Sequence, residues 1–127
     1  MKQSFRHFLN LHEISKKDID LILKYSHRLK KNYKTKQLKE KKILGIIFEK
    51  PSTRTKISFE VGMKLLNGDV VTLDHSDSQL GRGESLEDTM KVLSSYVDII
   101  AYRGSDESKL YKLSEISTVP IINGLTD

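Results

Sequence analysis

A hydroxyl-rich segment that contains one arginine holds the residue types that bind phosphate. Ser52, Thr53, Arg54 and Thr55 follow shortly after the apolar run at residues 43–48. In the first turn of a helix the backbone N–H groups are unpaired and the helix dipole is positive, so these side chains predict an anion site there. The segment lacks the Gly-rich stretch and the Gly-Lys-Ser/Thr ending of a Walker A loop. The alternative is that Ser52 is only an N-cap and Arg54 a surface residue.

Two further arginines lie in segments that follow predicted strands. Residues 74–85 form a polar stretch in which Arg82 has a glycine on each side, which indicates a loop able to carry a side chain to a site. Its alternative is a plain connection between two elements. Arg103 ends an apolar run and needs an anion, a carbonyl group or solvent, because a buried unpaired guanidinium is costly. An ion pair with Asp106 or Glu107 is the alternative for this arginine.

The hydropathy pattern predicts alternating strands and helices. Short apolar runs rich in β-branched residues predict strands, and apolar residues at steps of three and four predict helices. The expected strands are residues 43–48, 70–73, 98–102 and 119–122, and the expected helices are residues 15–30, 52–66, 85–96 and 106–117. This alternation predicts an α/β fold, a parallel four-stranded sheet with helices on both faces. Ligands bind at the carboxyl ends of the strands in such sheets, where the three arginines lie.

Individual residues refine these elements. Ser15, with Asp18 three residues later, predicts the N-cap of the first helix. Pro120 predicts a start or edge position for the last strand. The helix at residues 52–66 carries apolar side chains on two sides, so we expect it to be buried over a broad face.

The composition limits the class of protein. A chain of 127 residues predicts one domain, residues 1–127. The lack of cysteine excludes disulfides, thiolate metal sites and cysteine nucleophiles, and no histidine or carboxylate pair has metal-ligand spacing, so we expect neither metal nor cofactor. No apolar run approaches the roughly 18 residues that span a bilayer, and no secretory signal is visible. We therefore expect a soluble cytoplasmic protein with no membrane partner.

The positive charge is concentrated in one segment. The chain has 22 basic and 17 acidic residues, a net charge of +5. Residues 28–42 hold eight of the basic residues and one glutamate, or +7, so the rest of the chain sums to −2. We interpret this segment as a solvated helix end and linker. Nucleic-acid binding through residues 28–42 is the alternative, although Tyr33 is the only aromatic residue there that could stack on a base.

Taken together, these segments resemble the carbamoyltransferases, and ornithine more closely than aspartate carbamoyltransferase. Residues 48–60, Phe-Glu-Lys-Pro-Ser-Thr-Arg-Thr-Lys-Ile-Ser-Phe-Glu, resemble the carbamoyl-phosphate signature of that family. Lys50 favours the ornithine branch. Further family segments match in the right order at residues 6–11, 78–85 with 88–89, 102–104 and 119–127. The resemblance covers essentially the whole chain and implies the carbamoyl-phosphate domain of the carbamoyltransferase fold.

The resemblance also implies a role for each matching residue. The phosphate of carbamoyl phosphate would be held by Ser52, Thr53, Arg54 and Thr55. Arg54 and Arg103 would counter its charge, and Arg103 with Thr55 would polarise the carbonyl oxygen, which makes Arg54, Thr55 and Arg103 the expected catalytic residues. Gln79 would reach the phosphate site of a neighbouring subunit in a homotrimer.

The implied reaction transfers the carbamoyl group of carbamoyl phosphate to the δ-amine of ornithine and yields citrulline and phosphate, a step of arginine biosynthesis. The family has a second, amino-acid-binding domain that these 127 residues do not match. The resemblance therefore implies a truncated form that is inactive unless a longer chain or a complementing C-terminal half supplies that domain, and that exposes apolar surface normally covered. The alternative is a non-catalytic remnant that at most binds phosphate or carbamoyl phosphate.

Overall fold

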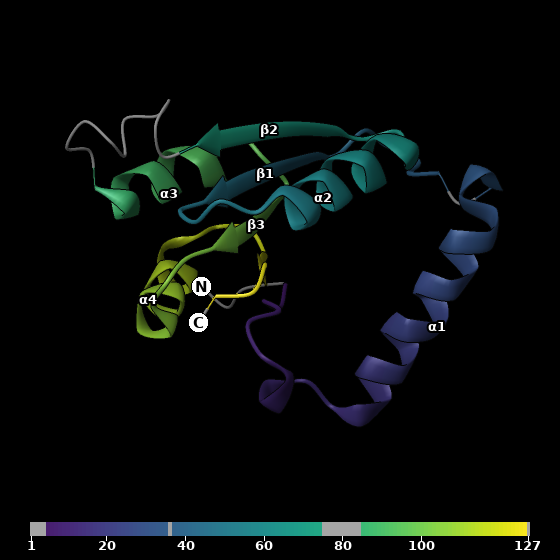
Figure 1. Ribbon diagram of the computed structural model, residues 1–127, viewed down its shortest axis with the longest axis horizontal. Helices are drawn as coiled ribbons and strands as arrows, with labels where there is room; N and C mark the ends of the chain where they lie inside the picture. The colour runs from purple at the N-terminus through teal and green to yellow at the C-terminus, as the bar shows by residue number, and fades with distance from the viewer. Residues whose placement is uncertain (1–4, 36, 75–84, 127) are drawn as a thin grey trace.

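A parallel sheet of four strands forms the centre of the computed structural model, which describes residues 5–35, 37–74 and 85–126 (Figure 1). The sheet has the order β2-β1-β3-β4, and all three pairings are parallel. Its strands are β1 (Ile43–Phe48), β2 (Asp69–Asp74), β3 (Ile99–Arg103) and β4 (Ile121–Asn123). The helices are α1 (Lys16–Asn32), α2 (Thr53–Leu65), α3 (Leu86–Ser94) and α4 (Glu107–Ile116), with short 3-10 turns η1 (Leu11–Glu13) and η2 (Tyr33–Thr35). The predicted α/β fold is confirmed.

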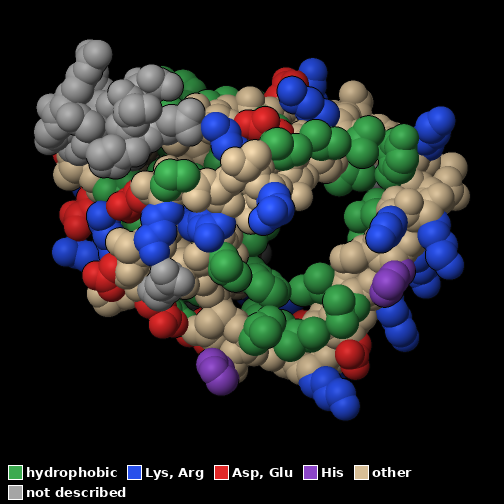
Figure 2. All heavy atoms as spheres, viewed as in Figure 1, with side chains coloured by type: hydrophobic (Ala, Val, Ile, Leu, Met, Phe, Trp, Pro, Cys, Tyr) green, Lys and Arg blue, Asp and Glu red, His purple; other side chains and the backbone are tan. Residues whose placement is uncertain are grey.

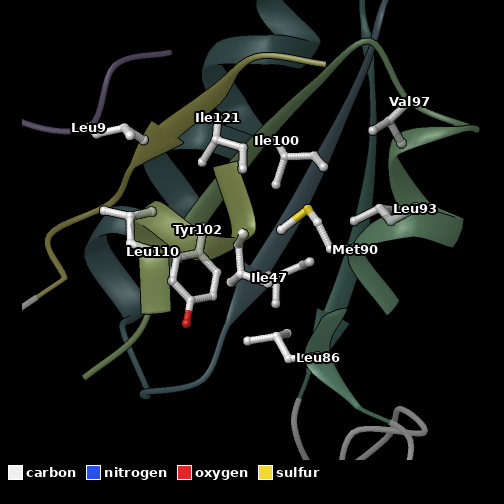
Figure 3. Close-up of a cluster of buried hydrophobic side chains, with 11 residues drawn as sticks. Leu9, Ile47, Leu86, Met90, Leu93, Val97, Ile100, Tyr102, Leu110 and Ile121 are labelled. Atoms are coloured by element: carbon white, nitrogen blue, oxygen red, sulfur yellow. The ribbon is translucent and has the colours of Figure 1, made fainter. Parts of the chain in front are cut away.

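Helices cover both faces of the sheet because side chains along each buried strand alternate in direction. Ile47 on β1 joins a buried cluster with α3 and α4, which Figure 3 shows around Met90. Its neighbour Ile46 joins a smaller cluster on the opposite face, against which Phe59 of α2 packs. Ile46 and Ile47 are fully buried, and burial of one such side chain contributes about 1.5–3 kcal/mol.

The last strand lies at one end of the sheet, as Pro120 predicts. Pro120 directly precedes β4, so its missing N–H costs no pairing bond within the strand. The N-terminal segment then pairs along the outside of β4, where the Phe8 N–H donates to the Ile121 carbonyl at 2.8 Å and the Asn123 N–H donates to the Phe8 carbonyl at 2.7 Å. The segment around Phe8 therefore lies beside β4, which is close to the other end of the chain in sequence (Figure 1).

His7 ties this N-terminal segment to the sheet, and we expect it to make stability depend on pH. Its Nδ1 accepts a hydrogen bond from the Ile121 N–H at 2.9 Å, and burial lowers the pKa of His7 below its usual 6.5. The unfolded chain therefore takes up a proton more readily than the folded one, so stability falls as the pH drops below about 6.5 towards the lowered pKa. His7→Asn keeps an acceptor but does not titrate, so we expect this variant to lose less stability than wild type as the pH falls.

Urea unfolding at about pH 7.5 and about pH 5 measures this effect. His27→Asn on the exposed surface of α1 is the control and should keep the wild-type dependence. An equal loss of stability in wild type and His7→Asn would show that another group carries the pH dependence.

The prediction that residues 52–66 form a helix buried over a broad face is wrong for one side of α2. Phe59 and Met63 pack against the sheet, but Ile57, Val61 and Leu65 are 52%, 48% and 43% exposed. The apolar periodicity identifies such a face but does not say what covers it, and no described residue does so.

Helix α1 also exposes apolar side chains. Ser15 caps it by accepting from the Asp18 N–H at 3.1 Å, as expected. The helix stands away from the sheet, and Figure 2 shows the opening between them. Leu21, Ile22 and Leu23 are all at least 45% exposed. The exposed apolar surface that the family resemblance implies is therefore present on α1 and α2.

Candidate functional site

Strand pairing brings two of the predicted site residues, Ser52 and Arg103, together at the carboxyl ends of β1 and β3. Phe48 at the end of β1 lies opposite Arg103 at the end of β3, and the Glu49 N–H donates to the Arg103 carbonyl at 2.8 Å. The chain then turns through Pro51 to Ser52, and α2 begins at Thr53.

The Ser52 hydroxyl does not make the hydrogen bond of an ordinary N-cap, in which the side chain accepts from an N–H of the helix. The Ser52 carbonyl accepts from the Lys56 N–H at 3.3 Å, but among the described residues the hydroxyl caps no N–H of α2. The hydroxyl instead accepts from Arg103 Nη1 at 2.6 Å. The alternative that Ser52 is only an N-cap is therefore wrong.

Arg103 is half-buried and only partly satisfied. Its guanidinium bonds Ser52 and forms no ion pair with Asp106, Glu107 or any other described residue, so the ion-pair alternative is wrong. Its Nε is buried and has no hydrogen-bond partner in the described part of the chain. A buried donor without a partner costs free energy, and an anion that accepted from this group would remove that cost.

The start of α2 presents further donors at the same edge. Because the Ser52 hydroxyl is bonded to Arg103, it leaves the first N–H groups of α2 uncapped, at the positive end of the helix dipole. Arg54 is exposed and Thr55 is half-buried, and neither side chain hydrogen-bonds a described residue. The edge therefore combines two arginines, hydroxyls and free amides, which together suit a phosphate group. Gln79 and Arg82 lie outside the described residues.

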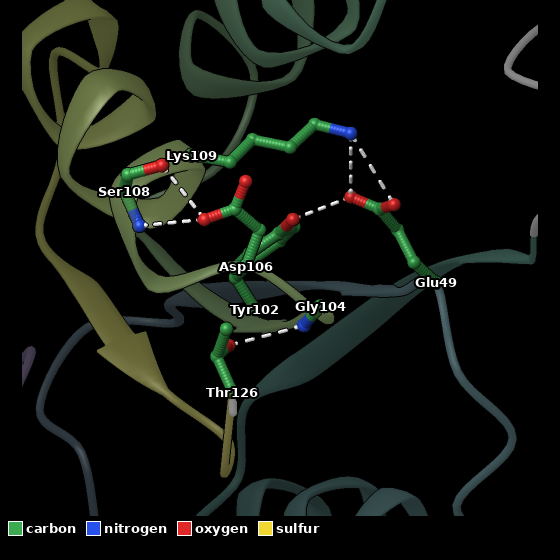
Figure 4. Close-up of polar contacts among 7 residues, drawn as sticks. All are labelled: Glu49, Tyr102, Gly104, Asp106, Ser108, Lys109 and Thr126. Carbon is green, nitrogen blue, oxygen red and sulfur yellow. Dashed lines mark hydrogen bonds and ion pairs between the residues drawn. The ribbon is translucent and has the colours of Figure 1, made fainter.

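A network on the other face of β3 was missed from the sequence. The Tyr102 hydroxyl donates to Glu49, and Lys109 Nζ lies 3.4 Å from both oxygens of the same carboxylate (Figure 4). Burial, with the hydrogen bond to Glu49, raises the pKa of Tyr102 far above its usual range. The signal available in the sequence was a tyrosine in a buried strand, because a buried hydroxyl needs a partner.

The C-terminal residues reach the same edge of the sheet. The Gly124 N–H donates to the Tyr102 carbonyl at 2.6 Å, and the Gly104 N–H donates to Thr126 Oγ1 at 3.0 Å (Figure 4). These two bonds hold residues 123–126 against the end of β3.

The basic segment, residues 28–42, lies on the side of the sheet where the strands begin, away from their carboxyl ends. Residues 28–42 comprise the end of α1, η2 and the linker that enters β1 at its amino end. Lys41 pairs with Asp69 at 3.3 Å, and Tyr33 is half-buried. The segment therefore does not contribute to the arrangement around Ser52 and Arg103.

The residues that the structure describes contain no group of three or more His, Cys, Asp or Glu side chains that could hold a metal ion. None of their helices is both long and apolar enough to cross a bilayer.

The comparison with protein families shows the family of the chain. A model described as the carbamoyl-phosphate-binding domain of aspartate/ornithine carbamoyltransferases matches residues 6–127. The chain belongs to the carbamoyltransferase family. Residues 48–60, which resemble the family signature, lie within this match over almost the whole chain.

Relatives of this carbamoyltransferase domain are similar over nearly all of its length. An ornithine carbamoyltransferase of Mesorhizobium japonicum is 47% identical over 128 residues, which are 98% of this chain and 42% of the relative. That of Agrobacterium fabrum is 46% identical over 96% of this chain and 41% of its own length. The chain thus spans about two fifths of the curated relatives that it matches.

Solved structures confirm the fold of the carbamoyltransferase domain. The ornithine carbamoyltransferase of Pyrococcus furiosus is 43% identical, with a TM-score of 0.87 over 96% of this chain and 40% of that one. The catalytic subunit of M. jannaschii aspartate transcarbamoylase is 41% identical, with a TM-score of 0.84 over 94% and 41%. Both branches of the family therefore share this fold with the chain.

Proposed function

We propose that this domain binds carbamoyl phosphate at the carboxyl edge of the sheet. The phosphate would lie on Ser52, Thr53, Arg54 and Thr55 at the start of α2, with Arg103 beside it. The observation that carries the proposal is the Ser52 hydroxyl, which bonds Arg103 at 2.6 Å instead of capping α2. That bond leaves uncapped amides and a guanidinium with an unpaired buried Nε at one place.

The chemistry of the substrate matches these donors. An amine attacks the carbonyl carbon of carbamoyl phosphate, the bond from that carbon to the phosphate oxygen breaks, and phosphate leaves. Arg54 and Arg103 would stabilise the charge on the leaving phosphate, and Arg103 with Thr55 would polarise the carbonyl oxygen. Fixing both groups of the substrate before the attack lowers the entropic cost of the reaction.

The acceptor of the carbamoyl group forms the second part of the proposal. The names of the curated relatives support ornithine, whose δ-amine would lose a proton, take up the carbamoyl group and become the ureido nitrogen of citrulline. We expect residues outside this chain to bind the amino acid, and a neighbouring subunit of a homotrimer to contribute Gln79. The purified chain alone should therefore bind carbamoyl phosphate and form no citrulline.

Titration calorimetry with carbamoyl phosphate, and separately with inorganic phosphate, tests the proposed function. We expect saturable binding at one site, with carbamoyl phosphate bound more tightly because its carbonyl meets additional donors. Equal affinity for the two ligands would favour the non-catalytic remnant that binds phosphate. The lack of binding to either would contradict the proposal, and citrulline formed by the chain alone would contradict the assignment of the amino-acid site to other residues.

A further inference from the structure

Two contacts join the ends of β1 and β3 from opposite sides. Tyr102 and Arg103 are consecutive residues of β3, so their side chains point to opposite faces of the sheet. Arg103 donates to Ser52 on one side, and Tyr102 donates to Glu49 on the other. Glu49 is also tied to β3 through its own backbone N–H.

The Tyr102 contact is held in place by its surroundings. Tyr102 is fully buried, so its hydroxyl has no access to water as a substitute partner for Glu49. A Cβ added at Gly104 would collide with that hydroxyl, so the glycine leaves the space in which it lies. Lys109, in the first turn of α4, pairs with the same carboxylate of Glu49 (Figure 4).

We propose that Tyr102, Glu49 and Lys109 are positioning residues that fix the segment 49–52, and so set the contact between Ser52 and Arg103 that receives the phosphate. None of the three is placed on the ligand itself, and the inference rests on the proposed function. Only two residues, Lys50 and Pro51, separate Glu49 from Ser52, so movement of the Glu49 side chain is transmitted to the start of α2.

Tyr102→Phe tests the network with the smallest change, because the ring stays and only the hydroxyl is lost. We expect the affinity for carbamoyl phosphate and for inorganic phosphate to fall about threefold to tenfold, the effect of one hydrogen bond. Tyr111→Phe is the matched control, since the Tyr111 hydroxyl also donates to a glutamate, Glu13, but at η1 near the N-terminus. The affinity of Tyr111→Phe for carbamoyl phosphate and for inorganic phosphate should equal that of wild type.

Variants of Glu49 separate positioning from charge. Glu49→Ala removes a negative charge near an anion site, so electrostatics alone would tighten the binding of phosphate. Positioning predicts weaker binding, because Tyr102 and Lys109 both lose their partner. Glu49→Gln keeps an oxygen that can accept from Tyr102, and should restore the wild-type affinity or exceed it.

The outcomes distinguish this inference from the proposed function. If wild type binds phosphate, and Tyr102→Phe and Tyr111→Phe bind it equally well, the inference is wrong and the proposed function stands. Tighter binding by Glu49→Ala would also overturn it. If wild type binds neither ligand, the proposed function fails, and the NMR signal of the Arg103 Nε–H decides the inference. A shift of that signal in Tyr102→Phe but not in Tyr111→Phe supports positioning, and no shift in Tyr102→Phe overturns it.

Discussion

We expect Arg54→Lys to weaken the proposed binding of carbamoyl phosphate by roughly 1.5–3 kcal/mol, or about tenfold to 150-fold. The guanidinium of Arg54 stands in the first turn of α2, exposed and without a hydrogen bond to a described residue, so it is available to the ligand. A planar guanidinium can bond two phosphate oxygens at once, and an ammonium group keeps the charge but loses this geometry. Titration calorimetry measures the change.

Arg28→Lys provides the control for Arg54→Lys. Arg28 is also exposed on a helix, but it lies on α1 within the basic segment at the other edge of the sheet. The affinity of Arg28→Lys should equal that of wild type. An unchanged affinity in Arg54→Lys, or an equal loss in both variants, would show that the phosphate does not bind at the start of α2.

We expect Leu110→Ala to destabilise the domain by about 2–5 kcal/mol, because it would leave a cavity in the core. Leu110 lies on α4, is fully buried, and belongs to the cluster that joins α3 and α4 to the sheet. A loss of this size is a large part of the roughly 5–15 kcal/mol that stabilises a typical domain. Urea unfolding, with comparison of the midpoints and slopes, measures it.

Leu23→Ala makes the same chemical change on an exposed surface. Leu23 is 54% exposed on α1, so its truncation should cost well under half as much as that of Leu110. Equal costs at the two positions would mean that the chain buries the apolar face of α1 in solution, in contradiction to the arrangement in Figure 1.

The strands could be predicted from sequence because each contains a short, largely apolar run. The predicted limits of the first strand, residues 43–48, are those of β1. The burial of α2 could not be predicted in the same way, since the apolar spacing of Ile57, Val61 and Leu65 is the same whether or not a partner covers that face. Amphipathic spacing identifies a face suited to burial, and only the packing partner decides its exposure.

The candidate site could be predicted in its location but not in its contacts. The position of Arg103 after a buried strand indicated the carboxyl edge of the sheet. Its bond to Ser52 depends on the register that places Phe48 opposite Arg103 and on the path of the chain through Pro51, and neither follows from residue types. The partner of Tyr102 was missed for the same reason, since Glu49 lies 53 residues away in the sequence.

The most direct test of the carbamoyl-phosphate site is a titration of the ¹⁵N-labelled chain with carbamoyl phosphate, followed by NMR. We expect the signals of the amides at residues 52–55 and of the Arg103 side chain to shift and saturate together. Shifts confined to residues 28–42, or no saturable shifts at all, would contradict a carbamoyl-phosphate site at the start of α2.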